Sequence, residues 1–411
     1  MGGKINVIGS RNTMGGQNMN ILILGNGFDL AHKLPTSYMD FLSFVKQVQD
    51  VIKQGPFENK DMEITIENRN GIISQTVTVN YDEWSRLISD NIWINYFMKN
   101  STYLKHNWID FETEISNVIQ VIDEARHLRL EKEDIDLANI KMHMLTDIIT
   151  SKLKEQKYDR CINGVFKELD TMEGFISDLI KDLNLLIGAL ELYLVEFVEQ
   201  IDCFLVSPDI KEIMVKFNKE KTAVTLCKII SFNYTHTFKK FYGHDNKFMY
   251  DYVHGEALAE RSIEDNNMVL GIDEYLTDEK KDKEIEFISF KKFFQRIQKQ
   301  TGCDYKLWLD AIRKDAKNKK SWVYDAKDHS KDNMHCLYVF GHSLDVTDRD
   351  VLRDLILNDN VMTTVFYRNK EQYGQQIANL VKVIGQDELI KRTGGSTKTI
   401  EFKLQQDMVS A

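Results

Sequence analysis

The chain has 411 residues, of which 43% are hydrophobic and 10% aromatic. This supply of apolar side chains excludes disorder over most of the length and predicts two or three domains with large cores. The formal net charge of −10 makes nucleic acid or an anionic membrane an unfavoured partner, and leaves only a local basic patch open. The five cysteines include no CxxC pair, which excludes a secreted disulfide scaffold and fits a reducing cytoplasm.

The N-terminal residues 1–18 are rich in glycine and asparagine and lack the apolar run of a secretory signal. We expect them to be disordered or tag-like. No segment reaches about 18 uninterrupted apolar residues, so no membrane-spanning helix and no membrane partner are expected. Both observations favour a cytoplasmic location.

The first predicted element is a buried parallel strand at residues 21–24, where a short apolar run ends in Gly25-Asn26-Gly27. A short helix follows, and Pro35 stops it. Residues 63–79 alternate between apolar and polar on both sides of Asn70-Gly71, which predicts a β-hairpin.

Residues 82–220 are predicted to be helical. Their clearest signal is a stripe of apolar residues between Leu169 and Leu190 that recurs every three or four positions, for which core packing is the favoured role. Charge-rich helical sequence at 278–319 and a helix near 371–384 separate some of the strand-like runs that return later. Those runs are residues 227–232, 250–253, 269–272, 336–340 and 363–367.

This alternation predicts an α/β fold: a doubly wound, Rossmann-like, mostly parallel sheet with a large, mostly helical insertion domain. The sheet domain is expected to combine residues 19–81, which include the hairpin, with residues 222–390. The insertion takes residues 82–221, and residues 391–411 form a C-terminal tail.

Polar or glycine-containing loops follow four of the predicted strands, at the end of the sheet where open α/β folds bind ligands. Gly25 and Gly27 would let backbone N–H groups approach a phosphate, although such a turn is as often only structural. For Asn233 and His254, a turn-capping and a structural role are the competing interpretations. The loop at 341–345 offers a glycine turn, a hydroxyl and a carboxylate. Together the four loops favour a nucleotide site.

Two other motifs could carry chemistry. Residues 108–112 would place Asp110 and Glu112 on one face if extended, as in a nuclease with a divalent ion, but a solvated helix start is favoured. Residues 291–296 mix basic and aromatic side chains, which favours an amphipathic helix face over a nucleic-acid contact. The histidines and cysteines lack the compact spacing of a metal site, so no metal is expected.

The loops together resemble the AbiH family of bacteriophage abortive-infection proteins. The resemblance rests first on residues 25–38, GNGFDLAHKLPTSY. Further motifs are SFNYT at 231–235, VHGE at 253–256, LGID at 270–273 and FGHSLD at 340–345. The resemblance implies a bacterial antiviral protein that acts in abortive infection.

The same loops are similar, over shorter stretches, to the sirtuin-like superfamily of NAD-binding proteins. The matching residues are Gly25, Gly27, Leu34, Pro35, Asn233, His254, Gly255, Gly341, Ser343, Leu344 and Val346. In that superfamily the first and last of these loops hold the phosphates and adenosine of NAD. The asparagine and the histidine act at the nicotinamide ribose.

The chain departs from the sirtuin-like pattern at positions that bear on its chemistry. Thr235 stands where the superfamily has an aspartate, and Lys33, Thr36 and Tyr38 replace residues of its first motif. No four-cysteine zinc ribbon lies between residues 255 and 340. These differences disfavour a lysine deacylase and favour the branch of the superfamily that hydrolyses NAD in phage defence.

The resemblance therefore implies a sirtuin-like NAD glycohydrolase with NAD as its substrate, no metal, and Asn233 and His254 as catalytic residues. The expected NAD-binding residues are Gly25, Asn26, Gly27, Asp29, Gly341, Ser343 and Asp345. The alternative is a sensor that binds NAD or an ADP-ribose-type nucleotide without cleaving it, and Thr235 keeps this alternative open. An enzyme is favoured, with a phage-derived trigger and a homo-oligomer left open as partners.

Overall fold

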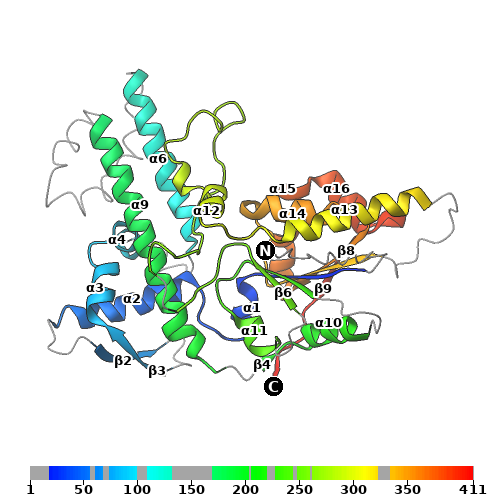
Figure 1. The fold of residues 1–411 in the computed structure, drawn as a ribbon, viewed down its shortest axis with the longest axis horizontal. Coiled ribbons are helices and arrows are strands. Elements are labelled where there is room, and N and C mark those ends of the chain that lie inside the picture. The colour runs from blue at the N-terminus through cyan, green and yellow to red at the C-terminus, as the bar shows by residue number, and fades with distance from the viewer. Residues whose placement is uncertain are drawn as a thin grey trace, which may run out of the picture.

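A computed structural model describes residues 18–55, 61–67, 74–99, 109–131, 169–202, 205–219, 227–243, 248–259, 262–322 and 334–410. Its centre is a sheet of six strands, all parallel to their neighbours (Figure 1). In spatial order the strands are β6 (Phe248–Tyr252), β5 (Cys227–Ser231), β1 (Asn20–Leu24), β7 (His335–Phe340), β8 (Val361–Tyr367) and β9 (Ile400–Leu404). The predicted α/β fold with a parallel sheet is confirmed.

Strand β1 lies inside the sheet because both of its faces are apolar. Ile21 and Ile23 pack on one side, and Leu22 and Leu24 on the other. The chain proceeds outward from β1 to β5 and β6, and then crosses over β1 to form β7, β8 and β9. This is the strand order of the Rossmann fold, in which ligands bind where the direction reverses, at the carboxyl ends of β1 and β7.

Helices cover both faces of the sheet (Figure 1). One face carries α13 (Tyr305–Trp322), α14 (Arg349–Ile356), α15 (Lys370–Ile384) and α16 (Gln386–Thr393). The other face carries α1 (Asn26–Ala31), α10 (Pro208–Lys219) and α11 (Thr237–Phe241). The helix predicted near 371–384 is thus confirmed as α15.

The remaining long helices form a second group beside the sheet, here called the helical body (Figure 1). Its members are α2 (Tyr38–Ile52), α3 (Tyr81–Ile88), α4 (Ile92–Lys99), α6 (Phe111–Glu131) and α9 (Leu169–Leu192), with the antiparallel hairpin of β2 (Asp61–Glu67) and β3 (Ser74–Asn80). Helix α9 continues into a π-helix, η1 (Tyr193–Phe197), and a 3-10 turn, η2 (Val198–Gln200). The predicted hairpin is confirmed, while its turn, Asn70-Gly71, lies outside the described residues.

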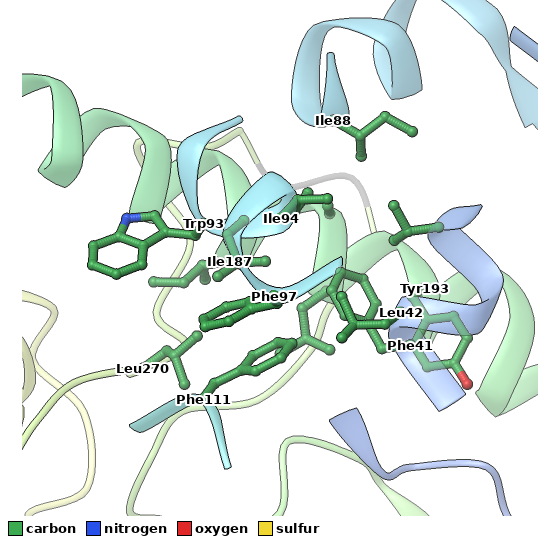
Figure 2. Close-up of a cluster of buried hydrophobic side chains, with 14 of the residues drawn as sticks. Phe41, Leu42, Ile88, Trp93, Ile94, Phe97, Phe111, Ile187, Tyr193 and Leu270 are labelled. Atoms are coloured by element: carbon green, nitrogen blue, oxygen red, sulfur yellow. The ribbon is translucent and has the colours of Figure 1, made fainter. Parts of the chain in front are cut away.

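Aromatic and aliphatic side chains fill the core of the helical body. Phe97 and Phe111 stack there with ring centroids 4.2 Å apart (Figure 2). From α9, Leu179, Leu186 and Ile187 are buried in the same cluster, so the core role predicted for the apolar stripe is confirmed. Phe111 also fixes the start of α6, which the site described below uses.

Three segments differ from the sequence expectation. Residues 278–287, expected to be helical, form turns and irregular backbone. Residues 269–272 are not a strand of the sheet: Ile272 makes a single bridge to Lys291, and the Gln295 side chain donates to the Leu270 carbonyl and accepts from its N–H. A side chain thus occupies the place of a neighbouring strand. Conversely, β9 adds a strand within the stretch expected to be a C-terminal tail.

The shorter elements complete the fold. They are η3 (Ile288–Phe290), α12 (Lys292–Gln298), η5 (Val346–Asp348), η6 (Gly395–Thr397), and the strand pair β4 (Leu205–Val206) and β10 (Val409–Ser410). Over the described ranges, no helix is both long and apolar enough to cross a membrane.

Candidate functional site

The four loops singled out in the sequence lie together at the carboxyl ends of β1, β5, β6 and β7. The Gly27 N–H donates to the Gly341 carbonyl at 2.8 Å, which joins the loops after β1 and β7. The Asn233 Nδ2 donates to the Gly25 carbonyl at 3.1 Å, which joins the loops after β5 and β1. Adjacent parallel strands therefore bring all four loops to one edge of the sheet.

The glycines of the first loop permit a close approach of two backbones. A Cβ on Gly25 would lie 2.6 Å from the His342 Cα, and a Cβ on Gly27 would lie 2.7 Å from the Gly341 carbonyl oxygen. Gly341 itself has a φ of +71°, a conformation that favours glycine. The N–H groups of Gly25 and Gly27 donate within this contact, so binding of a phosphate by them stays a prediction that needs the loops to separate.

Three of the expected NAD-binding residues lie at the rim. The exposed Asn26 exchanges hydrogen bonds with Thr36, at 2.6 and 3.2 Å. The side chain of Asp345 accepts from the Thr347 N–H and caps η5. Ser343 is exposed. These side chains are within reach of solvent and stay predictions as ligand contacts.

Asp29 and Asn233 form the polar centre of the edge near α1. The Thr235 hydroxyl donates to the Asp29 Oδ2 at 2.5 Å. The Oδ1 atoms of Asp29 and Asn233 are buried and have no hydrogen-bond partner among the described residues. Both residues line a cavity of about 10 Å³, which has room for about one water molecule. We call Asp29, Asn233 and Thr235 the Asp29 cluster.

The amide of Asn233 has a defined orientation, because only its NH₂ can donate to the Gly25 carbonyl. Its oxygen therefore faces the cavity as an acceptor. Burial raises the pKa of Asp29 to about 6, although hydrogen bonds from Thr235, Thr237 and Asn233 oppose this change. Asp29 is thus ionised at neutral pH, but its pKa is close enough to 7 for it to exchange a proton.

An open groove of about 380 Å³ lies next to the Asp29 cluster. Its lining residues are Leu34, Val198, Glu199, Ile201, Thr235, His236, Thr237, Lys239, Lys240, Phe241 and Leu258. Thr235 and Thr237 also line the small cavity. The groove therefore leads from solvent to the hydroxyl groups that surround Asp29.

His236 stands in this groove between two carboxylates. Its Nδ1 lies 2.7 Å from Glu199 and its Nε2 lies 2.8 Å from Glu256. Burial alone would lower the pKa of His236, but the hydrogen bonds to Glu199 and Glu256 outweigh it and raise the pKa to about 9. The imidazole is therefore a cation at neutral pH, and it ties η2 of the helical body to the loop after β5.

We expect this ion cluster to make stability depend on pH. The pKa of His236 is about 9 when folded and 6.5 in its ordinary state, so its contribution is full below about pH 6.5 and is lost as the pH rises toward 9. His236→Gln should therefore lower the free energy of unfolding by on the order of 1–3 kcal/mol more at pH 6 than at pH 9. Urea unfolding of both proteins at the two pH values measures this difference, and an equal loss at both would contradict it.

A second cluster, here called the Asp348 cluster, lies on the other side of the loop after β5. The Asp348 Oδ1 is 3.1 Å from the His254 Nε2, and its Oδ2 is 3.3 Å from the His342 Nε2. The Lys292 Nζ is 3.2 Å from Asp348 and 2.8 Å from the Glu112 Oε2. Asp348, His254, His342 and Lys292 are all buried.

The charges of the Asp348 cluster compensate one another. Burial alone would raise the pKa of Asp348, but the charge of Lys292 and the hydrogen bonds from His254 and His342 hold it well below its usual range. Burial lowers the pKa of His254, and Lys292 lowers it further. His254 is therefore neutral at pH 7, and its Nε2 carries the proton because a carboxylate can only accept.

The motif at residues 108–112 starts a helix, as the sequence favours. Asp110 accepts from the Glu112 N–H and the Thr113 hydroxyl, at 3.1 and 2.7 Å, and so caps α6. Glu112 is not solvated as expected but pairs with Lys292. The two carboxylates thus have separate structural partners, which argues against a shared metal-dependent nuclease site. Trp108 lies outside the described residues.

The sequence of the chain also matches a known protein family. A family model described as bacteriophage abortive infection AbiH matches residues 21–367. The chain belongs to the AbiH family. The match spans both clusters and confirms the resemblance, and it assigns this AbiH protein to antiphage abortive infection. No curated protein and no solved structure matches the chain.

The AbiH site separates the two residues expected to act together. Asn233 belongs to the Asp29 cluster and His254 to the Asp348 cluster, and no hydrogen bond joins them in the part of the chain that the structure describes. Phe232 precedes Asn233 in the chain, and its ring packs on the Asp348 cluster, 5.3 Å from the His254 ring and 4.3 Å from the His342 ring. Lys292 and Asp348 were not predicted as site residues, because in the sequence each resembles an ordinary charged residue on a helix surface.

Proposed function

We propose that this AbiH protein hydrolyses NAD at the bond between nicotinamide and ribose. The observation that carries the proposal is the pair of buried acceptors without partners, Asp29 Oδ1 and Asn233 Oδ1, at the ligand-binding edge of a Rossmann-type sheet. A buried polar group without a partner costs about 1–3 kcal/mol. Ribose hydroxyls and an attacking water both supply the donors that these two oxygens lack.

The groove beside the Asp29 cluster suits the nicotinamide end of the substrate. Its volume of about 380 Å³ falls within the usual range of ligand pockets. Its apolar walls, which include Ile201 and Phe241, fit a planar ring. Because Thr235 lines both the groove and the small cavity, a ring placed in the groove would bring its ribose toward Asp29 and Asn233.

The proposed reaction uses water as the nucleophile. Asp29 accepts a proton from a water that Asn233 orients, and the water oxygen bonds to C1′ of the ribose as the bond from C1′ to the nicotinamide nitrogen breaks. The electron pair of that bond neutralises the pyridinium, so the products are nicotinamide, ADP-ribose and a proton. Such a transition state resembles that of glycoside hydrolysis, where a positioned carboxylate is the usual base.

Asp29 accounts for the largest departure from the sirtuin-like pattern. The superfamily has an aspartate where this chain has Thr235, and the Asp29 carboxylate lies 2.5 Å from the Thr235 hydroxyl. We assign the missing carboxylate to Asp29 on this basis. His254 keeps the role expected from the sequence, with its unprotonated Nδ1 accepting from a ribose hydroxyl.

A second candidate, a sensor that binds NAD or an ADP-ribose-type nucleotide without cleaving it, is favoured by the burial of the catalytic pair. Asn233 is 7% exposed and His254 is 6% exposed. A nucleotide could then change the packing of the four loops without chemistry. Cellular NAD separates the candidates, because only a hydrolase consumes it.

We expect the wild type to deplete cellular NAD during phage infection, and Asn233→Ala not to. The side chain of Asn233 bonds to the Gly25 carbonyl and to the Asp29 carboxylate and belongs to no apolar cluster, so the variant should still accumulate. Mass spectrometry of extracts from infected cells measures NAD, with an immunoblot for the protein. NAD that stays undepleted in the wild type would reject hydrolysis, and equal depletion in both strains would exclude Asn233 from the reaction. Phage protection without NAD depletion would favour the sensor.

A further inference from the structure

The proposed reaction does not use the buried charges around Asp348. Glu112, Lys292 and Asp348 form a continuous row in which Lys292 bridges two carboxylates at 2.8 and 3.2 Å. The row ends at His254 and His342, each of which contacts one carboxylate oxygen of Asp348 through its Nε2. Burial raises the pKa of Glu112 to about 8, although the charge of Lys292 opposes this rise. Burying charged groups is unfavourable unless each has a partner, and each member of the row has one.

The row crosses from the helical body to the sheet. Glu112 lies in the first turn of α6, and its neighbour Phe111 is fixed by stacking on Phe97 at 4.2 Å and on Tyr38 at 4.1 Å. Figure 2 shows Phe97 and Phe111 lying against one another in this core. Lys292 begins α12, and Asp348 ends η5. A shift of α6 would therefore move the carboxylate that holds Lys292.

We propose that Glu112 and Lys292 are positioning residues that hold the Asp348 carboxylate between His254 and His342, and so orient His254 for the reaction from the helical body. The assignment of His254 to the reaction rests on the proposed function. The orientation of His254 does not depend on the proposed function, because it follows from the contacts described above.

Both histidines have the same tautomer under this arrangement. The Leu344 N–H donates to the His342 Nδ1 at 2.9 Å, so the His342 proton lies on Nε2, which faces Asp348. The His254 Nε2 faces the same carboxylate. A buried carboxylate is costly without a compensating cation, and Lys292 supplies this charge to Asp348.

The charged groups that face His254 come from two elements. Lys292 and Arg296 belong to α12, and Asp348 belongs to η5. Arg296 is itself paired with Asp350. Glu112 of α6 reaches His254 only through Lys292. Removing the Lys292 charge should therefore leave Asp348 as the dominant neighbour of His254.

The test is the ring titration of His254, followed by NMR on the full chain with labelled histidine and assigned with a His254→Gln variant. We expect Lys292→Met to raise the titration midpoint of His254 by about one pH unit or more, because a repelling cation is lost while Asp348 stays. Lys291→Met is the matched control: Lys291 is an adjacent buried lysine, paired with Glu274 at 2.8 Å instead. It should leave the midpoint unchanged.

A second variant keeps the test decisive if Lys292→Met does not fold. Asp348→Asn removes the carboxylate with little change in size, so the His254 midpoint should fall. An unchanged midpoint in the folded Lys292 or Asp348 variant, or an equal shift in Lys291→Met, would overturn the positioning role.

Activity separates this inference from the proposed function. If NAD is hydrolysed, Lys292→Met should lower kcat by about 10-fold to 100-fold with a smaller change in KM, because a misplaced group reduces the rate of the chemical step. Lys292→Arg should restore most of the rate. If the wild type leaves NAD intact but the titrations shift as expected, the hydrolase proposal fails and the positioning role stands.

Discussion

Replacing Asp29 by asparagine is expected to lower NAD turnover by about 10²–10⁴-fold while leaving the protein at least as stable as the wild type. The amide keeps the size of the side chain and an acceptor for the Thr235 hydroxyl, but it cannot take a proton from water. Steady-state nicotinamide release and urea unfolding measure the two properties.

The gain in stability follows from the sign of the pKa change. Burial raises the pKa of Asp29 from 3.8 to about 6, so the stability contributed by its bound proton is full below about pH 3.8 and is lost as the pH rises through 6. At pH 7 the buried charge opposes folding by on the order of 1–3 kcal/mol. A residue that lowers stability but is needed for turnover is typical of an active site.

Asp251 provides the matched control for Asp29. It is a second buried carboxyl whose pKa burial raises to about 6, but it lies in β6 and accepts from the Tyr305 N–H at 2.6 Å. Asp251→Asn should keep wild-type turnover and the rise of kcat through about pH 6, whereas Asp29→Asn should lose both. Retention of that rise in Asp29→Asn would exclude Asp29 as the base.

Gly341→Ala is expected to be strongly destabilising, because Gly341 combines a positive φ with a close contact between two loops of the site. Gly341 has a φ of +71°, and a Cβ there would lie 2.2 Å from the Phe28 N and 2.6 Å from the Gly27 carbonyl carbon. The left-handed conformation costs about 1–2 kcal/mol in alanine. Forcing the two loops apart adds about 1–3 kcal/mol. Denaturant unfolding measures the total.

Gly385 isolates the contribution of the loop contact. It also has a positive φ, +89°, but no atom lies within 4 Å of the position of its Cβ. With a ψ of 152° it lies in a backbone region that other residues rarely adopt, so Gly385→Ala should show a conformational cost without a steric clash. If both variants lose the same stability, then the packing of the first glycine loop against the loop after β7 does not stabilise the protein.

The loops of the site could be predicted from the sequence because their signals are local. Buried strands read as apolar runs, and the parallel arrangement brings residues that follow them, such as Gly25, Asn233 and His254, to one edge. Each signal needs only a few consecutive residues. The structure added that Asn233 bonds to Gly25 and that Asp29 bonds to Thr235.

The Asp348 cluster could not be predicted, because its pairs are distant in the chain and carry no periodic signal. Lys292 and Asp348 are 56 residues apart, and each resembles a surface charge until its burial is known. Residues 269–272 read as a strand because they are apolar, but the Gln295 side chain takes the backbone hydrogen bonds of Leu270. Tertiary contacts decide both cases.

The most direct test of NAD hydrolysis is to measure nicotinamide and ADP-ribose after incubating the purified full chain with NAD. The incubation is run with and without extract from phage-infected cells, since the resting site is buried. We expect the activated wild type to release the two products in equal amounts and Asp29→Asn to release neither. NAD that stays intact in the activated wild type, or that disappears without free nicotinamide, would contradict the proposed reaction.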